Sequence, residues 1–152
     1  FIMGNFNYVL DLPSEQLRDL KDSDLTESKI QELLSHDEFI KVKSKILGEG
    51  FAEGVDDKGP TFSPTWSLRL DRGSKDCQVG DTLDRGLKSL VRKCYSADSR
   101  FIGWKSRIVY GNYEDSTYKT SCEFYQSYDV GNIRRTGETA IIGVFNLKNE
   151  RR

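Results

Sequence analysis

Residues 101–147 read FIGWKSRIVYGNYEDSTYKTSCEFYQSYDVGNIRRTGETAIIGVFNL, and this stretch decides the fold class. Three segments, 101–113, 117–128 and 138–147, are rich in the β-branched and aromatic residues that favour extended strands. The segments are separated by two clusters that contain turn-forming Asn, Asp or Gly. The stretch therefore predicts three strands joined by turns.

The residues that precede this stretch predict one more strand and a helix. Apolar and polar side chains alternate over 62–70, which is the pattern of a half-buried strand. Asp81 is a suitable N-cap for an amphipathic helix that ends at Cys94 and carries one apolar stripe.

The first third of the chain predicts helices. A short helix is expected from Pro13 to Lys21, and a second one after the N-cap Thr26. Ser35 and Glu38 have the spacing of a capping box and predict the start of a third helix. Helices first, then strands with one inserted amphipathic helix, predict an α+β fold with a mainly antiparallel twisted sheet.

Composition indicates one globular domain over residues 1–152. Hydrophobic residues make up 36% and charged residues 31% of the chain, with a mean hydropathy of -0.61. No apolar stretch approaches the ~18 residues of a transmembrane helix, and no secretory signal is visible. The chain opens on Phe1, so an upstream segment could have been removed. We expect an intracellular protein.

The net charge of -1 hides an asymmetry along the sequence. Residues 1–60 carry 7 Lys and Arg against 13 Asp and Glu, a balance of -6, and residues 61–152 carry 16 against 11, a balance of +5. An acidic front and a basic back predict a dipolar surface that suits self-association or an anionic partner.

Segment 48–60 reads GEGFAEGVDDKGP and shows no periodicity, so we expect a mobile loop rich in Gly and acidic residues. Its Gly spacing does not fit a phosphate-binding loop, and Glu49 and Glu53 would repel phosphate. A tether or a partner-binding loop fits this composition better.

No catalytic motif, cofactor site or metal site emerges from the residues. His36 is the only histidine, which excludes enzymes that need two imidazoles. We expect it at the first position of a capped helix. Cys77, Cys94 and Cys122 form no C-x-x-C pair, which argues against zinc and favours three reduced thiols.

The candidate binding residues are basic. Arg85, Lys88, Arg92 and Lys93 share one face of the predicted helix, and Lys105 and Arg107 follow on an aromatic strand. These six residues are our candidates for contacts with an anionic surface, either RNA phosphates or an acidic membrane.

From Thr65 onward the order of elements resembles the globular domain of rhabdovirus matrix proteins. The resemblance rests on a strand (TWSLRL, 65–70), an amphipathic helix that ends at Cys94-Tyr95, a basic aromatic strand start (RFIGWK, 100–105), and strands that end in AIIGVF (140–145). It covers a little over half of the chain.

The resemblance implies a non-enzymatic viral structural protein that self-associates and bridges the ribonucleoprotein to a membrane during assembly. Such a protein acts in the host cytoplasm or nucleus and in the virion. The Gly-rich loop, with Gly48, Gly50, Phe51 and Gly54, would supply head-to-tail contacts between copies. Two alternatives stay open: a small RNA- or protein-binding effector, and a toxin-like nuclease that works without histidine.

Overall fold

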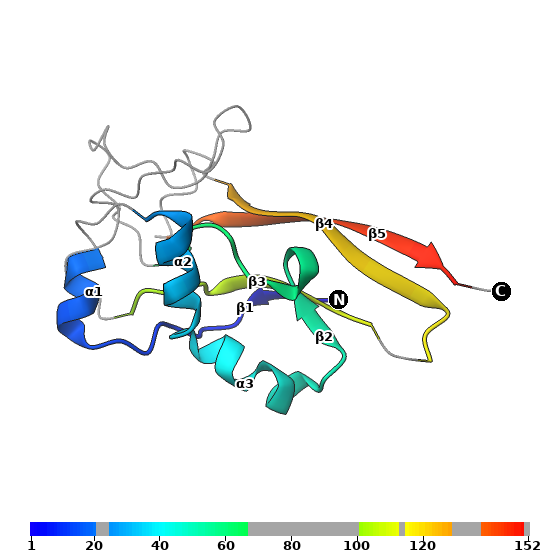
Figure 1. Ribbon diagram of the computed structural model, residues 1–152, viewed down its shortest axis with the longest axis horizontal. Coiled ribbons are helices and arrows are strands. Elements are labelled where there is room, and N and C mark those ends of the chain that lie inside the picture. The colour runs from blue at the N-terminus through cyan, green and yellow to red at the C-terminus, as the bar shows by residue number, and fades with distance from the viewer. Residues whose placement is uncertain (21–24, 67–100, 113–114, 129–137, 151–152) are drawn as a thin grey trace.

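The computed structural model describes residues 1–20, 25–66, 101–112, 115–128 and 138–150 (Figure 1). It confirms an α+β fold. The elements are β1 (Ile2–Asn5), α1 (Ser14–Leu20), α2 (Glu27–Leu34), α3 (Glu38–Leu47), β2 (Phe51–Glu53), a 3-10 turn η1 (Val55–Asp57), β3 (Ser106–Gly111), β4 (Tyr118–Tyr128) and β5 (Ala140–Asn149).

The described strands form two antiparallel sheets. β1 and β2 pair with opposite sides of β3, so that the order of the first sheet is β1-β3-β2. β4 and β5 form the second sheet, a long two-stranded pairing with a bulge between Cys122 and Phe124. The predicted strands at 117–128 and 138–147 are thus confirmed to within a few residues.

β3 is packed between the β4–β5 sheet and α3. On one of its faces, Tyr110 contacts Phe145 of β5 with ring centroids 5.3 Å apart. On the other face, the Arg107 guanidinium lies 4.7 Å from the ring centroid of Phe39 in α3. Figure 1 shows α1 and α2 at one end of these layers, where their buried leucines join Ile102 and Trp104 in the hydrophobic core.

The predicted strand at 101–113 is shorter than expected. Residues 101–105 do not join the ladder, because Gly103 makes an isolated bridge with Trp66 and Ile102 accepts the Leu10 N–H at 2.8 Å. A Cβ on Gly103 would lie 2.7 Å from the Cα of Val9. Glycine is therefore required for the N-terminal segment to pass this close.

The caps of the helices are only partly as predicted. Thr26 caps α2 and accepts the Lys29 N–H at 3.3 Å, which confirms the prediction. The capping box at Ser35 is wrong: Asp37 caps α3 and accepts the Ile40 N–H at 2.9 Å, whereas Ser35 ends α2. His36 accordingly lies in the turn between the two helices, not at the first position of α3.

Segment 48–60 is not an irregular loop, which corrects the prediction. It contains β2 and η1. Two hydrogen bonds anchor it to distant residues: the Asn112 N–H donates to the Gly50 carbonyl at 2.7 Å, and the Tyr110 hydroxyl donates to the Gly54 carbonyl at 3.0 Å. A third bond, from the Gly59 N–H to the Glu53 carbonyl at 2.9 Å, lies within the segment. A strand this short leaves no periodicity in the sequence. Its order comes from residues far along the chain.

Some predictions fall outside the described residues. Of the predicted strand at 62–70, the structure describes only the first part, in which Phe62 is buried and its carbonyl accepts the Trp104 indole N–H at 2.7 Å. The predicted amphipathic helix between Asp81 and Cys94 lies entirely outside them.

Candidate functional site

Arg107 of β3 is fully buried and joins two other elements, α3 and β2. One terminal nitrogen, Nη2, lies 2.5 Å from Asp37 Oδ2 at the start of α3, and the other, Nη1, lies 2.8 Å from Glu53 Oε2 of β2. Its Nε donates to the Trp104 carbonyl at 2.7 Å. Each of its three nitrogens therefore has an acceptor inside the protein.

This geometry overturns one predicted binding residue. Arg107 cannot contact RNA or a membrane surface, because it has no exposed area and two carboxylates already bind its guanidinium. The sequence could not reveal this, because Asp37 and Glu53 lie 70 and 54 residues away along the chain.

Tyr125 of β4 completes the buried network. Its hydroxyl donates to Glu53 Oε1 at 2.9 Å and accepts the Ile108 N–H at 3.1 Å. Burial raises the pKa of both Asp37 and Glu53, and its effect outweighs the opposite effect of the positive charge on Arg107. Burial and the neighbouring Glu53 also raise the pKa of Tyr125. Since Asp37, Glu53 and Arg107 have no solvent access, we assign the network a structural role.

The other predicted basic residues divide into two groups. Lys105 lies on the surface of the fold, with its Nζ 4.2 Å from the centroid of the Trp66 ring, a cation–π contact. The four predicted helix residues, Arg85, Lys88, Arg92 and Lys93, lie outside the described residues. Of the predicted basic patch, the structure therefore describes only Lys105 and Arg107.

The predicted self-association residues are not on one exposed loop. Phe51 is half-buried in β2 opposite Gly111, and the Gly50 carbonyl is bonded to Asn112. Gly54 has a φ of 74°, and a Cβ there would lie 2.3 Å from the Gly59 carbonyl oxygen. Gly48 alone of the four is exposed, at the end of α3.

The sulfur chemistry of the described part is simple. Cys122 is a free, buried thiol on β4, and its Sγ lies 3.4 Å from the Phe124 carbonyl oxygen. Cys77 and Cys94 fall outside the described residues. Within the described ranges, no three His, Cys, Asp or Glu side chains are grouped as metal ligands.

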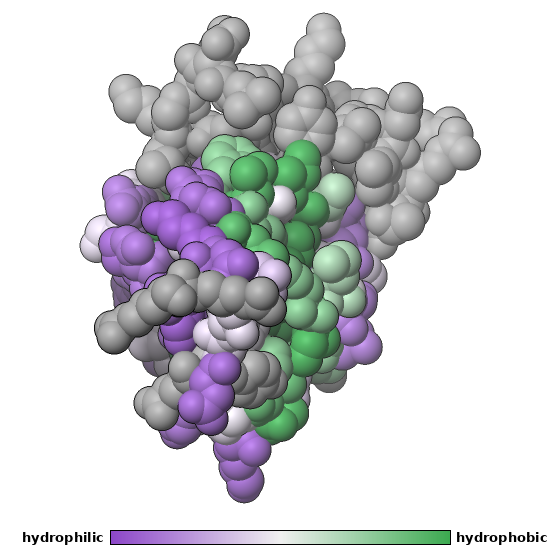
Figure 2. All heavy atoms as spheres, turned by 90° about the vertical axis from the view of Figure 1, so that its right-hand side faces the viewer, coloured by the Kyte–Doolittle hydropathy of each residue, from purple (hydrophilic) through white to green (hydrophobic). Residues whose placement is uncertain are grey.

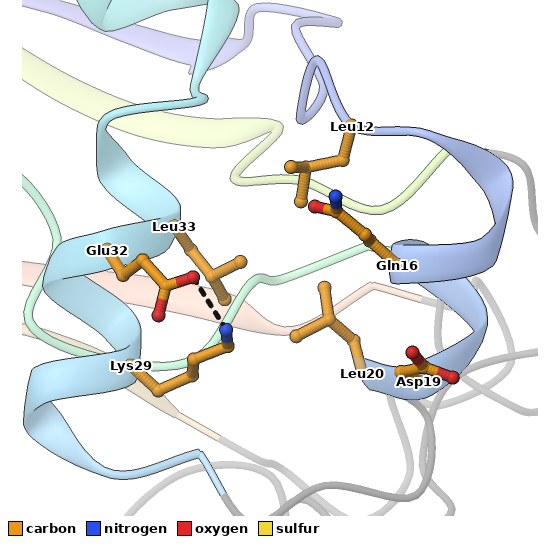
Figure 3. Close-up of a pocket in the computed structure, with 7 residues that line it drawn as sticks. All are labelled: Leu12, Gln16, Asp19, Leu20, Lys29, Glu32 and Leu33. Carbon is orange, nitrogen blue, oxygen red and sulfur yellow. Dashed lines mark hydrogen bonds and ion pairs between the residues drawn. The ribbon is translucent and has the colours of Figure 1, made fainter.

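A pocket of about 270 Å³ lies between α1 and α2 (Figure 3). Leu20 and Leu33 point into it from the two helices, and Lys29 pairs with Glu32 at 2.7 Å along one wall. The remaining lining residues are Leu12, Gln16 and Asp19. The pocket is a gap between two packed helices, and its Lys29 and Glu32 already pair with each other.

The most unusual exposed feature is apolar. β1 and β5 are both edge strands of the described sheets. They are also in contact: Phe1, before β1, packs on Phe145 of β5 with ring centroids 4.9 Å apart, and Asn5 at the end of β1 donates to Glu138, before β5, at 3.5 Å. We call the exposed apolar side chains on these two strands the β1–β5 edge surface. They are Phe1, Ile2, Met3, Ile142, Val144 and Leu147.

The β1–β5 edge surface is large and uncharged. Figure 2 shows a band of hydrophobic residues down this end of the molecule, bordered by hydrophilic ones. Val144 is 51% exposed, Leu147 57% and Met3 67%. Residues 139–147 carry no charge and no proline. Natural proteins usually protect an edge strand with lysine, proline or a bulge, and the bulge here lies on β4.

Comparisons with known proteins give no family. No family model matches the chain, and no curated protein matches it either. Among the described helices, none has the length and apolar composition needed to cross a membrane.

Proposed function

We propose that this protein is a non-enzymatic structural protein that assembles with copies of itself through the β1–β5 edge surface. One observation supports the proposal: two edge strands, β1 with no charged side chain and β5 with none before Lys148, lie next to each other and expose apolar residues to solvent. Such strands present unpaired backbone groups beside apolar side chains, which is the pattern of a protein–protein contact.

The resemblance to rhabdovirus matrix proteins fits this proposal and extends it. In a protein of that type, self-association would build a layer that bridges the ribonucleoprotein to a membrane, inside the host cell and in the virion. Contacts with an anionic partner would then come from Lys105 and from the predicted helix residues Arg85, Lys88, Arg92 and Lys93. Arg107 has no part in them.

The test is the mass of the protein in solution across a concentration series. We expect concentration-dependent association of the natural chain, and we expect Val144→Lys to weaken it at least tenfold, because the lysine places two like charges and their hydration in an apolar contact. The matched control is Gln31→Lys, which adds the same charge at an exposed position of α2.

The result that contradicts the proposal is equally specific. A natural chain that stays monomeric up to about 1 mM, where the free energy of association would be weaker than about -4 kcal/mol, has no functional self-contact. A monomer that changes mass only when short RNA is added, with an affinity that falls steeply with salt, would be an RNA-binding module instead.

A further inference from the structure

The outer edge of β5 shows how two copies would meet. Backbone N–H groups alternate in direction along a strand. Glu150 donates its N–H to Thr117 beside β4, and Thr120 of β4 directs its own N–H and carbonyl away from β5, to the side chain of Asn112. The backbone groups of even-numbered residues of β5 therefore point toward β4, and those of odd-numbered residues point away from it.

The outward groups begin to be available after Thr139. Thr139 itself donates its outward N–H to the Thr65 carbonyl at 3.2 Å, which confirms the alternation and closes this end of the edge. Within the described part of the chain, no strand pairs with the outer side of β5 beyond that point. The uncharged run ends at Leu147, because residue 148 is a lysine. Segment 141–147 is thus uncharged, and no described strand lies on its outer side.

We infer that segment 141–147 pairs antiparallel with the same segment of a second copy, centred on Val144, so that two β4–β5 sheets join into one four-stranded sheet. This inference rests on the proposed self-association and specifies its geometry. Its occupant is a second copy because the segment is self-complementary: reversed against itself, it sets no charged residue opposite another.

The register centred on Val144 satisfies both backbone and side chains. The outward backbone N–H and C=O groups of Gly143 then lie opposite those of Phe145 in the second copy, and those of Ile141 lie opposite those of Leu147. Each of these pairs occurs twice, because the two copies are related by symmetry. The two Val144 side chains face each other, and the exposed Leu147 is covered by the Ile141 of the second copy. Lys148 falls opposite Ala140 of the second copy, so no two charged residues face each other within 140–148.

Cysteine cross-linking tests the register in a background with Cys77→Ser, Cys94→Ser and Cys122→Ala. In a non-hydrogen-bonded antiparallel pair the Cα atoms are about 4.5 Å apart, which a disulfide spans. We expect Val144→Cys to cross-link with itself under mild oxidation. Asn146→Cys alone is the matched control, because its two copies would be about 13 Å apart along the strands. A mixture of Ile142→Cys and Asn146→Cys should cross-link.

Amide hydrogen exchange on the natural chain gives a second measurement that needs no substitution. We expect the outward amides of Gly143 and Phe145 to become protected as concentration rises, while the Val144 amide, bonded to β4, is protected throughout. Association without these changes, and without the 144 and 142–146 cross-links, overturns the register and the edge pairing but leaves self-association standing. A chain that never associates overturns both.

Discussion

Arg107 lies where β2, β3 and the start of α3 meet, and its removal leaves two carboxylates buried side by side. We expect Arg107→Ala to lower the free energy of unfolding by about 3–5 kcal/mol, the usual cost of leaving a buried charge without its partner. Urea unfolding measures this. Lys105→Ala is the control, since the half-buried cation–π contact of Lys105 with Trp66 contributes only about 0.5–2 kcal/mol. Equal losses in the two variants would contradict the buried pairing.

The same residues give stability an unusual dependence on pH. Burial raises the pKa of Glu53 and Asp37 above their values in the unfolded chain. At pH values between the unfolded and the folded pKa, the folded chain therefore binds more protons than the unfolded chain. Their contribution to stability is fully present below the unfolded pKa of about 4 and is lost as the pH rises through the folded pKa.

Glu53→Gln should therefore reduce the loss of stability between mildly acidic and neutral pH, because a neutral amide replaces the second carboxylate beside Arg107. Thermal or urea unfolding of both chains across this range measures the difference. Glu49→Gln, an exposed position in the same part of the chain, controls for the change in net charge. A natural chain that gains stability toward neutral pH relative to Glu53→Gln would show that the sign is wrong.

At the scale of elements, the turn from β2 into η1 depends on one glycine. Gly54→Ala should destabilise the fold strongly, by about 2 kcal/mol or more, because the position has a positive φ and the new Cβ would meet the Gly59 carbonyl oxygen. Gly48→Ala separates the two causes: its φ is 93°, but nothing lies within 4 Å. If both variants unfold at the same urea concentration, the close contact at Gly54 contributes nothing.

The elements that the sequence predicted well are those specified by their own residues. Thr26 predicts the start of α2, and the β-branched and aromatic residues of 138–147 predict β5. The start of α3 was misplaced because Asp37 is selected by its contact with Arg107 as well as by its capping bond. β2 was missed because three residues carry no period, and their partners in β3 lie far along the chain.

At the scale of the molecule, the acidic and basic parts of the sequence do not form two separate ends in the ranges that the structure describes. β1 and β2, from the acidic part, flank β3, from the basic part, so the two parts are interleaved in one sheet. The uncharged run at 139–147 was visible in the sequence, but its position at an edge follows only from the sheet order. This is why the candidate site moved from basic residues to apolar ones.

The pairing of β1 with β3 also has a consequence during synthesis on the ribosome. Ile2 pairs with Val109, so the first strand leaves the ribosome about 100 residues before its partner. At ordinary translation rates this interval is on the order of ten seconds. Throughout it, Ile2 and Met3 remain on an uncharged segment that has no strand to join, and the nascent chain is a natural client for a chaperone until β3 emerges.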